Sequence, residues 1–521
     1  MQKNTILFVV CSAITMFVWF FYFTPQQQSA QIAQSNADVV QNQKDESKEE
    51  AETLAQSISA DADIGSTKEE EFLVETDKFK AVFSNKGASI LSWSIKEKSG
   101  QWVDLVFPNS APAMSNFPGS VYKIISQSKE KITFEYSSMQ GWKIIKTFNL
   151  SDAYMHNLNI EIEKSSEASF PQISVDWGPG LGTDERELKE NTSLTRVTAY
   201  TLNKPFKLKK LKNNSFVASD YKWSAVDNRY FLAAFIPNEP ADFNQIMSNR
   251  ANKKVPYSLQ LTANPQKDIN KKAYSLDFYL GPKDYTYLKT YNLGLEKTVD
   301  FGFFGFLGKL AFAVLSYFHK LTSNYGWAII MLTICIQILV LPLTLKSFKS
   351  AAAMKRIQPL IKDIQTKYKD DPKRLQAEML HIYRNQKVNP LGGCLPMLLQ
   401  LPIFWAFFTM LRNAYELRNE GWILWVKDLS TADQFMTFGS FSLNLLPLIM
   451  GLGMFFQQKM TTAVSDPTQK KIMYILPIVF TFMFWTFPSG LVIYWLTNSV
   501  ISMIEQYFVI KKDTATNIKH A

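Results

Sequence analysis

The sequence is poor in the residue types that most often hold metals or form cross-links, with only three cysteines and four histidines among 521 residues. Cys11, Cys335 and Cys394 all lie in apolar runs, and none falls in the long polar region that precedes residue 300. A disulfide framework is therefore excluded in that region. We interpret the three thiols as buried and chemically inert.

Catalytic motifs are also lacking. The patterns HExxH, CxxC and GxSxG do not occur, and the histidines are far apart in the sequence, at His156, His319, His381 and His520. A loose acidic group is interpreted as a solvated loop rather than as paired catalytic carboxylates; it consists of Asp176, Asp184, Glu185 and Glu187. We expect no enzymatic activity, no metal and no cofactor.

Charge is concentrated in one place within the last third of the chain. The net charge is +10, and the segment from Lys346 to Lys387 contains eleven basic residues and four acidic ones. Such an excess of positive charge between two apolar runs is typical of a cytoplasmic loop in a membrane protein. This placement argues against DNA as a partner and leaves ribosomal RNA or anionic lipid open.

Long hydrophobic runs are abundant, and each is near the roughly 20 residues that cross a bilayer. We predict six spans: Ile6–Phe23, Trp327–Leu345, Leu391–Leu411, Leu443–Met460, Ile472–Phe487 and Ser489–Ile510. No small-x-small cleavage site follows the first run, so we expect an uncleaved signal-anchor. An even number of spans places both termini on one side, and the basic residues at both termini make that side cytoplasmic.

The region between the first two spans changes character along its length. Residues 26–71 have the polar, aromatic-poor composition of a disordered linker. Alternating runs then predict strands at Lys131–Tyr136, Trp142–Phe148 and Leu158–Glu163. We expect a β-sandwich of about 200 residues outside the membrane.

Two helical features flank the second span. Apolar residues recur at helical spacing over Phe301–Leu321, namely Phe303, Leu307, Leu310, Val314, Phe318 and Leu321. We predict a helix in the membrane interface, and the alternative is a short helix buried in the β domain. The basic loop predicts a helical hairpin made of Ala351–Tyr368 and Pro372–Asn385, because Pro372 follows acidic residues that can cap a helix.

The segment Asn389–Phe408 is the most informative stretch, because it is apolar and yet contains helix breakers, including Pro396 and Pro402, and the polar Gln400. Breakers persist in membrane helices where neighbouring helices or a wet cavity satisfy the freed backbone groups. Polar residues also share a helix face in two other spans: Thr333 with Gln337, and Tyr494 with Asn498. Such residues mark functional sites by default, so we predict a shared polar groove, although each could simply hydrogen-bond a neighbouring helix.

Several motifs resemble those of the YidC family of bacterial membrane protein insertases, in the Gram-negative form with a large periplasmic domain. They are Asn389–Pro396, Gln400–Phe404, Ser465–Pro467 with Gln469–Met473, Phe487–Leu491 and Pro342–Thr344. The motif positions include Pro342, Pro396, Pro402, Asp466, Pro467, Pro488 and Gly490. The resemblance covers the whole chain in order.

The resemblance implies a fold and a non-enzymatic activity. It implies a polytopic α-helical membrane protein of the bacterial inner membrane with a five-helix insertase core and a periplasmic all-β super-sandwich. The family inserts and helps fold nascent membrane proteins through a hydrophilic groove, alone or with the Sec translocon, and without ATP hydrolysis. The implied partners are nascent membrane proteins, the Sec translocon, the ribosome at the hairpin and tail, and the phospholipid bilayer.

The resemblance also assigns groove residues, with two departures. Thr333 and Tyr494 match family positions, and Gln337, Gln400 and Asn498 complete the expected groove. Trp495 stands where the family has the second residue of a tyrosine pair, and Gln337 stands where the family usually has an arginine. Gln337 keeps the polarity but not the positive charge that is held to attract acidic substrate residues.

The expected organisation is an anchor (residues 1–25), a linker (26–71), the super-sandwich (72–295), the interface helix (296–325), the core (326–511) with its hairpin (347–388), and a cytoplasmic tail (512–521). Two other functions stay open from the residues alone. One is a polytopic transporter with an external binding domain, which usually shows internal repeats and intramembrane charges. The other is an anchored, carbohydrate-active sandwich, which leaves five spans unexplained.

Overall fold

The computed structural model describes residues 68–165, 170–182, 192–201, 208–211, 221–243, 245–250, 255–263, 269–386, 388, 395–438, 441–461 and 467–518. The predicted anchor and residues 26–67 of the predicted linker lie outside these ranges. The described residues form two compact units. We call them the β unit, whose described residues lie within Glu50–Asp300 and Asn413–Glu416, and the helical unit, whose described residues lie within Phe301–Arg412 and Leu417–Ala521.

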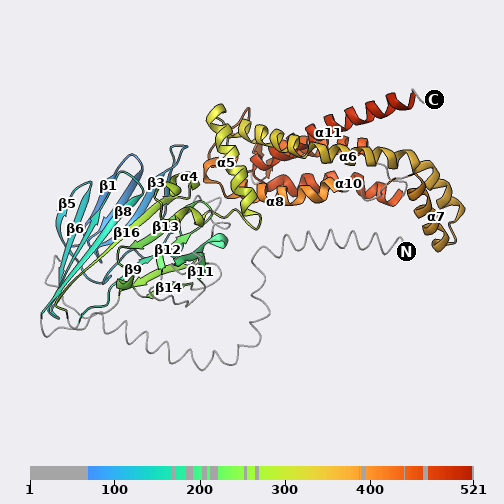
Figure 1. Cartoon of the computed structure of the whole chain (residues 1–521). Coiled ribbons are helices and arrows are strands. Elements are labelled where there is room, and N and C mark those ends of the chain that lie inside the picture. The colour runs from blue at the N-terminus through green and yellow to red at the C-terminus, as the bar shows by residue number, and fades with distance from the viewer. Residues whose placement is uncertain are drawn as a thin grey trace. The chain divides into compact units, whose positions relative to one another are not determined.

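The β unit contains three antiparallel sheets (Figure 1). The largest has the strand order β11-β10-β12-β13-β16-β8-β7-β6-β5, the second β1-β2-β3-β4 and the third β14-β15-β9. The strands of the large sheet are β5 (Lys123–Gln127), β6 (Lys131–Ser137), β7 (Trp142–Asn149), β8 (Met155–Lys164), β10 (Arg196–Thr201), β11 (Leu208–Leu211), β12 (Tyr221–Asp227), β13 (Phe231–Pro237) and β16 (Lys271–Pro282). The others are β1 (Glu71–Glu75), β2 (Phe79–Ser84), β3 (Ser89–Lys96), β4 (Trp102–Asp104), β9 (Ser174–Trp177), β14 (Gln245–Asn249) and β15 (Ser258–Thr262). The predicted sandwich class is confirmed.

Hydrophobic alternation explains why these segments are strands. In β7, every second side chain is buried, beginning with Trp142. Successive side chains of a strand point to opposite faces, so this pattern places one apolar face on the core. The three strands predicted from alternation correspond to β6, β7 and β8 and are confirmed.

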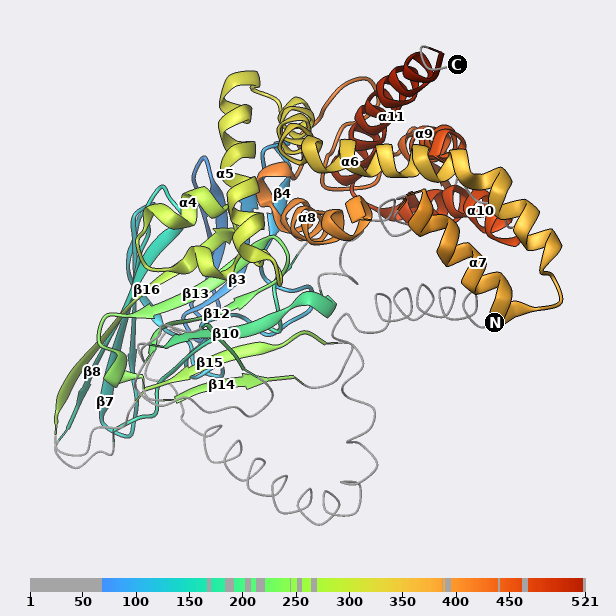
Figure 2. The ribbon, with the colours of Figure 1, turned by 45° about the vertical axis from the view of Figure 1, so that its right-hand side comes forward.

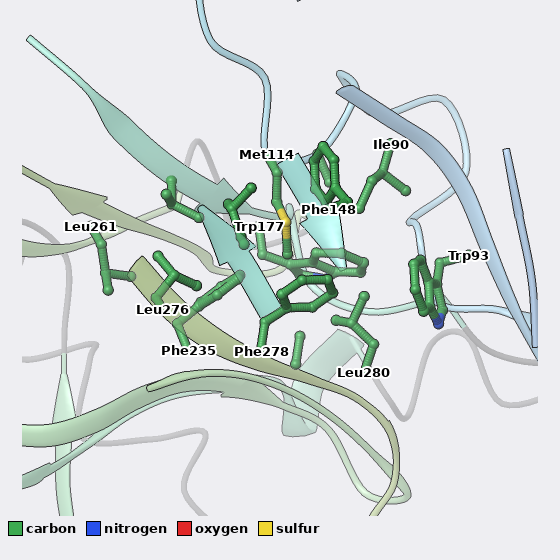
Figure 3. Close-up of a cluster of buried hydrophobic side chains, with 14 of the residues drawn as sticks. Ile90, Trp93, Met114, Phe148, Trp177, Phe235, Leu261, Leu276, Phe278 and Leu280 are labelled. Atoms are coloured by element: carbon green, nitrogen blue, oxygen red, sulfur yellow. The ribbon is translucent and has the colours of Figure 1, made fainter. Parts of the chain in front are cut away.

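The core of the β unit is a cluster of aromatic and aliphatic side chains (Figure 3). Trp93 of β3 stacks on Phe79 with ring centroids 4.6 Å apart and meets the edge of Phe278 of β16 at 6.1 Å. Phe278 also contacts Phe148 of β7 at 6.3 Å. Because β3 belongs to the four-stranded sheet and β7 and β16 to the large one, the core lies between these two sheets.

Four residues that follow the β domain by more than a hundred positions in the sequence are also part of the β unit. Asn413–Glu416 follow the predicted third span in sequence, yet cluster with the β domain. The ring of Tyr415 contacts Phe231 of β13 at 6.1 Å, and the Nζ of Lys98 donates to the carbonyl oxygen of Glu416 at 3.0 Å. These contacts hold the segment against the sheet.

The helical unit is made of helices that pack against one another (Figure 2). Its helices are α5 (Gly305–Thr322), α6 (Tyr325–Lys367), α7 (Pro372–Asn385), α8 (Leu395–Asn413), α9 (Leu445–Thr461), α10 (Pro467–Met483) and α11 (Ser489–Ile518). The short strands β17 (Met436–Phe438) and β18 (Phe441–Leu443) pair before α9. Among the described residues, α6 is the one helix that is long and apolar enough to cross a membrane, and Met473–Thr486 is a shorter apolar stretch.

Helix α6 is longer than the sequence predicts. The predicted span Trp327–Leu345 and the predicted first hairpin helix Ala351–Tyr368 form one continuous helix of 43 residues. The side chain of Asn324 starts it by accepting a hydrogen bond from the backbone of Gly326 at 2.9 Å. Pro342 lies inside the helix and does not end it. A proline removes one backbone hydrogen bond, and the packing of α6 against α5 and α11 is compatible with that loss.

The predicted interface helix is α5, and much of its apolar stripe is exposed, namely Phe303, Leu307, Leu310 and Leu321. Phe303, just before its start, and Phe306 are 96% and 81% exposed, while Phe312 and Leu315 are buried on the other side. These exposed apolar side chains face away from the protein, which is typical of a helix that lies on a lipid surface.

One expectation about the cysteines is wrong. Cys335 of α6 is exposed rather than buried, because it lies on the outward side of the helix while Thr333 and Gln337 face inward. Cys11 and Cys394 lie outside the described residues.

Candidate functional site

The polar residues of α6 are buried on one face. Thr333 is 1% exposed and Gln337 is 7% exposed, four residues apart in the helix. The hydroxyl of Thr333 donates to the carbonyl oxygen of Ile329 at 2.7 Å, within its own helix. Hydroxyls of Ser and Thr commonly satisfy themselves in this way inside helices.

Helices α8 and α11 bring together two of the predicted groove residues. Tyr494 is 2% exposed, and its hydroxyl lies near the side-chain amide of Gln400 in α8. The ring of Tyr494 also stacks on Phe407 of α8 with centroids 4.8 Å apart. Asn498 lies one turn further along α11 and is 8% exposed. Helices α8 and α11 therefore meet at Tyr494, Gln400 and Phe407, and the predicted groove stays a prediction.

Trp495 is positioned differently from its neighbours. Its ring packs among Phe404 of α8, Phe480 of α10 and Phe484, with centroids 5.1, 5.8 and 5.2 Å away. The indole therefore belongs to an aromatic cluster that joins three segments. Its predicted place in a groove stays a prediction.

A further polar pair was missed by the sequence analysis. The hydroxyl of Thr344 in α6 donates to Oε2 of Glu505 in α11 at 3.2 Å. A signal was available, because Glu505 follows Asn498 by seven residues, or two helical turns, and so lies on the same face.

The motif around Pro488 and Gly490 has a structural role at the start of α11. The backbone of Ser489 donates to Thr431 at 2.7 Å, and that of Gly490 donates to Leu429 at 3.0 Å. A Cβ on Gly490 would lie 3.1 Å from the carbonyl oxygen of Leu429, so a side chain there would push the loop away.

The remaining motif residues fall at helix starts or inside helices. Pro396 lies in the first turn of α8 and Pro467 is the first residue of α10. Pro402 lies inside α8, as Pro342 does in α6. Asp466 lies outside the described residues.

In the β unit, the interpretation of the acidic group is wrong for Asp176. This residue is on β9 rather than in a solvated loop, and burial raises the pKa of its carboxyl to about 6 while Lys146 opposes the rise. Lys146 is itself buried, and its ammonium donates to Oδ1 of Asn116 at 2.9 Å. Burial lowers the pKa of Lys146 to about 7, and the charge of Asp176 opposes this. Residues 184, 185 and 187 lie outside the described residues.

The histidine of the β core is a packing residue. His156 contacts the rings of Phe79 and Trp93, and its Nδ1 accepts a hydrogen bond from the backbone of Ser151 at 3.2 Å. Burial lowers the pKa of His156 to about 3, so the ring is neutral. In the described ranges no group of three or more His, Cys, Asp or Glu side chains is arranged to hold a metal ion.

Comparisons with known proteins identify the family of this chain. Residues 317–516 match the family model "60Kd inner membrane protein", and residues 105–314 match "YidC periplasmic domain". Membrane protein insertase YidC of Endomicrobium trichonymphae is 68% identical over 522 residues, which cover all of both chains. This chain belongs to the YidC family. The YidC of Syntrophus aciditrophicus is 32% identical over 98% of this chain and 100% of its own.

Family membership assigns the two units. YidC proteins are inner-membrane insertases with a periplasmic domain, so the β unit is the periplasmic β-sandwich and the helical unit is the membrane core. A solved active YidC insertase shares 20% identity, covers 87% of this chain and 95% of that one, and has a TM-score of 0.40. YidC from Thermotoga maritima shares 16% identity with a TM-score of 0.29, covering 85% and 98%.

Proposed function

We propose that this insertase moves nascent inner-membrane proteins along the polar face formed by α6, α8 and α11, alone or with the Sec translocon. The observation that supports this is the burial of Thr333, Gln337, Tyr494 and Asn498 in the apolar stretches of α6 and α11, with Gln400 of α8 near Tyr494. Intramembrane polar residues of this kind mark pathways rather than anchors. In this proposal the residues line a hydrophilic groove.

The physical reason is that a polar group without a hydrogen-bond partner in hydrocarbon raises the free energy by several kcal/mol. A hydrophilic segment that enters the bilayer needs hydrogen-bond partners part of the way across. The hydroxyl and amide groups of the polar face supply them, and the apolar segment that follows leaves sideways into lipid. Hydrophobic partitioning drives this step, so no ATP hydrolysis is required.

Gln337 makes the groove different from one with a fixed cation. Its amide donates and accepts hydrogen bonds but exerts no Coulomb attraction on acidic substrate residues. An arginine at the centre of a span costs about 2.5–3.5 kcal/mol on insertion scales. Without that charge, the helix that carries Gln337 is inserted into the bilayer at a lower free-energy cost. Substrates of this chain are therefore not selected by an acidic translocated tail.

The proposed topology has six spans with both termini in the cytoplasm. In this arrangement the basic segment formed by the end of α6 and by α7 lies in the cytoplasm. The structure has no buried residue in α7, and that helix starts at the cap Asp371, which accepts from the backbone of Arg374 at 3.1 Å. An exposed basic hairpin is suited to contacting ribosomal RNA or anionic lipid, and α5 is suited to the membrane interface.

A crosslinking experiment tests the groove directly. A photoreactive amino acid at position 337 should crosslink to a ribosome-bound nascent membrane protein in vesicles that contain the full-length protein. The matched control is position 339, because Leu339 lies on the same helix and is 80% exposed. Strong crosslinks at 339 and none at 337 would contradict the groove and favour contact at the outer surface.

A second test removes the polar groups. Replacing Thr333, Gln337 and Tyr494 together with leucine should abolish insertion of a short-tailed substrate in reconstituted vesicles. The variant's thermal unfolding should stay cooperative, which separates loss of the groove from loss of the fold. Normal insertion by the folded variant would refute the proposal, and solute flux through the wild-type protein would favour a transporter instead.

A further inference from the structure

Two rows of polar residues with the same spacing lie on α6 and α11, which pack together in the membrane core. On α6 the row is Thr333, Gln337 and Thr344, and on α11 it is Tyr494, Asn498 and Glu505. In each row the second residue follows the first by four positions and the third follows the second by seven. At 3.6 residues per turn these offsets keep all three residues on one face.

The hydrogen bond between Thr344 and Glu505 fixes the register of the rows. The two residues are 161 positions apart, which is also the separation of Gln337 from Asn498. Helices α6 and α11 pack together and run in the same direction through the unit (Figure 1). At 1.5 Å per residue, Glu505 therefore lies about 10 Å along the polar face from Gln337.

Glu505 supplies the charge of this polar face. The other five residues of the two rows are neutral, and within the described part of the chain Glu505 forms no ion pair. Lys346 and Lys349 follow Thr344 closely, but their side chains are exposed on other sides of α6. A half-buried carboxylate that has a hydroxyl partner and no cation is placed to bind one.

The position of Glu505 along the face identifies the cation that fits. Thr344 is two residues before the basic stretch, so in the proposed topology Glu505 lies at the cytoplasmic end of the groove. Transmembrane segments of membrane proteins carry Lys and Arg at their cytoplasmic ends. These are the cations that come to this depth during insertion and do not cross.

We propose that Glu505 binds the basic residues that flank an incoming transmembrane segment and holds that flank at the cytoplasmic end of the groove. This inference rests on the proposed groove and adds a specificity-determining residue to it. The charge recognised is the positive flank that stays inside, and not a negative tail that is translocated. Glu505 thereby biases the orientation in which a substrate is inserted.

The test uses two single-span substrates that differ only in the cytoplasmic flank, Lys-Lys or Gln-Gln, and full-length protein reconstituted in vesicles. The wild-type protein should insert the Lys-Lys substrate about two- to fivefold better, the range expected for a partly exposed ion pair. Glu505→Gln retains an acceptor for Thr344 and should remove this preference without changing insertion of the Gln-Gln substrate. Asp363→Asn is the matched control, because it removes one exposed negative charge elsewhere on α6 and should leave the preference intact.

The outcomes separate this inference from the groove itself. A preference for Lys-Lys that survives Glu505→Gln, or an equal loss for both substrates, would overturn the role of Glu505 while the groove stands. Failure of the wild-type protein to insert either substrate would count against the groove. Glu505→Lys should reverse the preference toward a Glu-Glu flank, and the absence of reversal would also overturn the inference.

Discussion

Replacing Glu416 with glutamine should change how the stability of the periplasmic unit depends on pH. The Glu416 side chain is almost fully buried, and its Oε1 accepts a hydrogen bond from the backbone of Tyr285 at 2.8 Å. Its Oε2 has no hydrogen-bond partner among the described residues. Burial, and then the nearby carboxylate of Asp284, raise the pKa of Glu416 to about 8, while Lys98 opposes the rise.

The direction of the effect follows from proton binding. The carboxyl ionises near pH 4.5 in the unfolded chain and near pH 8 in the folded protein, so between these values the folded state holds a proton that the unfolded state has lost. The contribution of Glu416 to stability is therefore highest below about pH 4.5 and decreases as the pH rises toward 8. Each pH unit is worth about 1.4 kcal/mol, which gives a loss of about 4 kcal/mol between pH 5 and pH 8. For a unit of this size that corresponds to roughly 10 °C in Tm.

Glu416→Gln removes this dependence and adds a constant penalty. The amide still accepts from Tyr285, but it buries two N–H donors without partners, which costs about 1–3 kcal/mol at every pH. The variant should be less stable than the wild type at pH 5 and more stable at pH 8. The crossing of the two curves is the signature of the buried acid.

The difference in stability between the wild type and Glu416→Gln is measured by thermal unfolding of the full-length protein in detergent, followed by tryptophan fluorescence at pH 5 and pH 8. Trp93, Trp177 and Trp223 are fully buried in the periplasmic unit and report its unfolding. Glu71→Gln is the matched control, because Glu71 is exposed and the substitution should leave the pH dependence unchanged. Parallel curves for the wild type and Glu416→Gln would refute the reasoning, since they would mean that the folded protein carries an ionised Glu416.

Two other substitutions probe packing. Phe278→Ala should destabilise the periplasmic unit by about 3–5 kcal/mol, because it removes a fully buried ring that contacts Trp93 and Phe148; an unchanged Tm would contradict this. Gly451→Ala should destabilise the membrane core by about 1–3 kcal/mol, because its Cβ would lie 1.9 Å from Oγ1 of Thr481, and Thr481→Ala should restore much of the loss. A double variant that is no more stable than Gly451→Ala alone in detergent unfolding would contradict this contact between α9 and α10.

The sequence was informative wherever structure depends on local periodicity. Strands β6, β7 and β8 were predicted from alternation, and the start of α7 from Pro372 and its cap. The order of the sheet was not predictable, since β8 pairs with β16 more than a hundred residues later. Such pairing depends on side-chain packing across the whole unit, which alternation within one segment does not encode.

The polar face was predicted only in part, because helical periodicity shows which residues share a face of one helix but not which helices meet. Helical spacing placed Thr333 with Gln337 and Tyr494 with Asn498, because those pairs lie within one helix. The approach of Tyr494 to Gln400 and the hydrogen bond from Thr344 to Glu505 join different helices, so periodicity alone did not reveal them. The position of Asp176 on a strand was missed because that strand is only four residues long and gives too short a pattern.

The segment Asn413–Glu416 determines where the chain can be divided when domains are exchanged between relatives. The periplasmic domain is discontinuous in sequence, since its main part ends at Asp300 and four more residues return from the membrane core. A chimera that exchanges residues 72–295 alone would leave Tyr415 without Phe231 and Glu416 without Lys98 and Tyr285. The two halves are therefore not independent modules, and grafts between relatives should carry this short segment together with the domain to which it belongs.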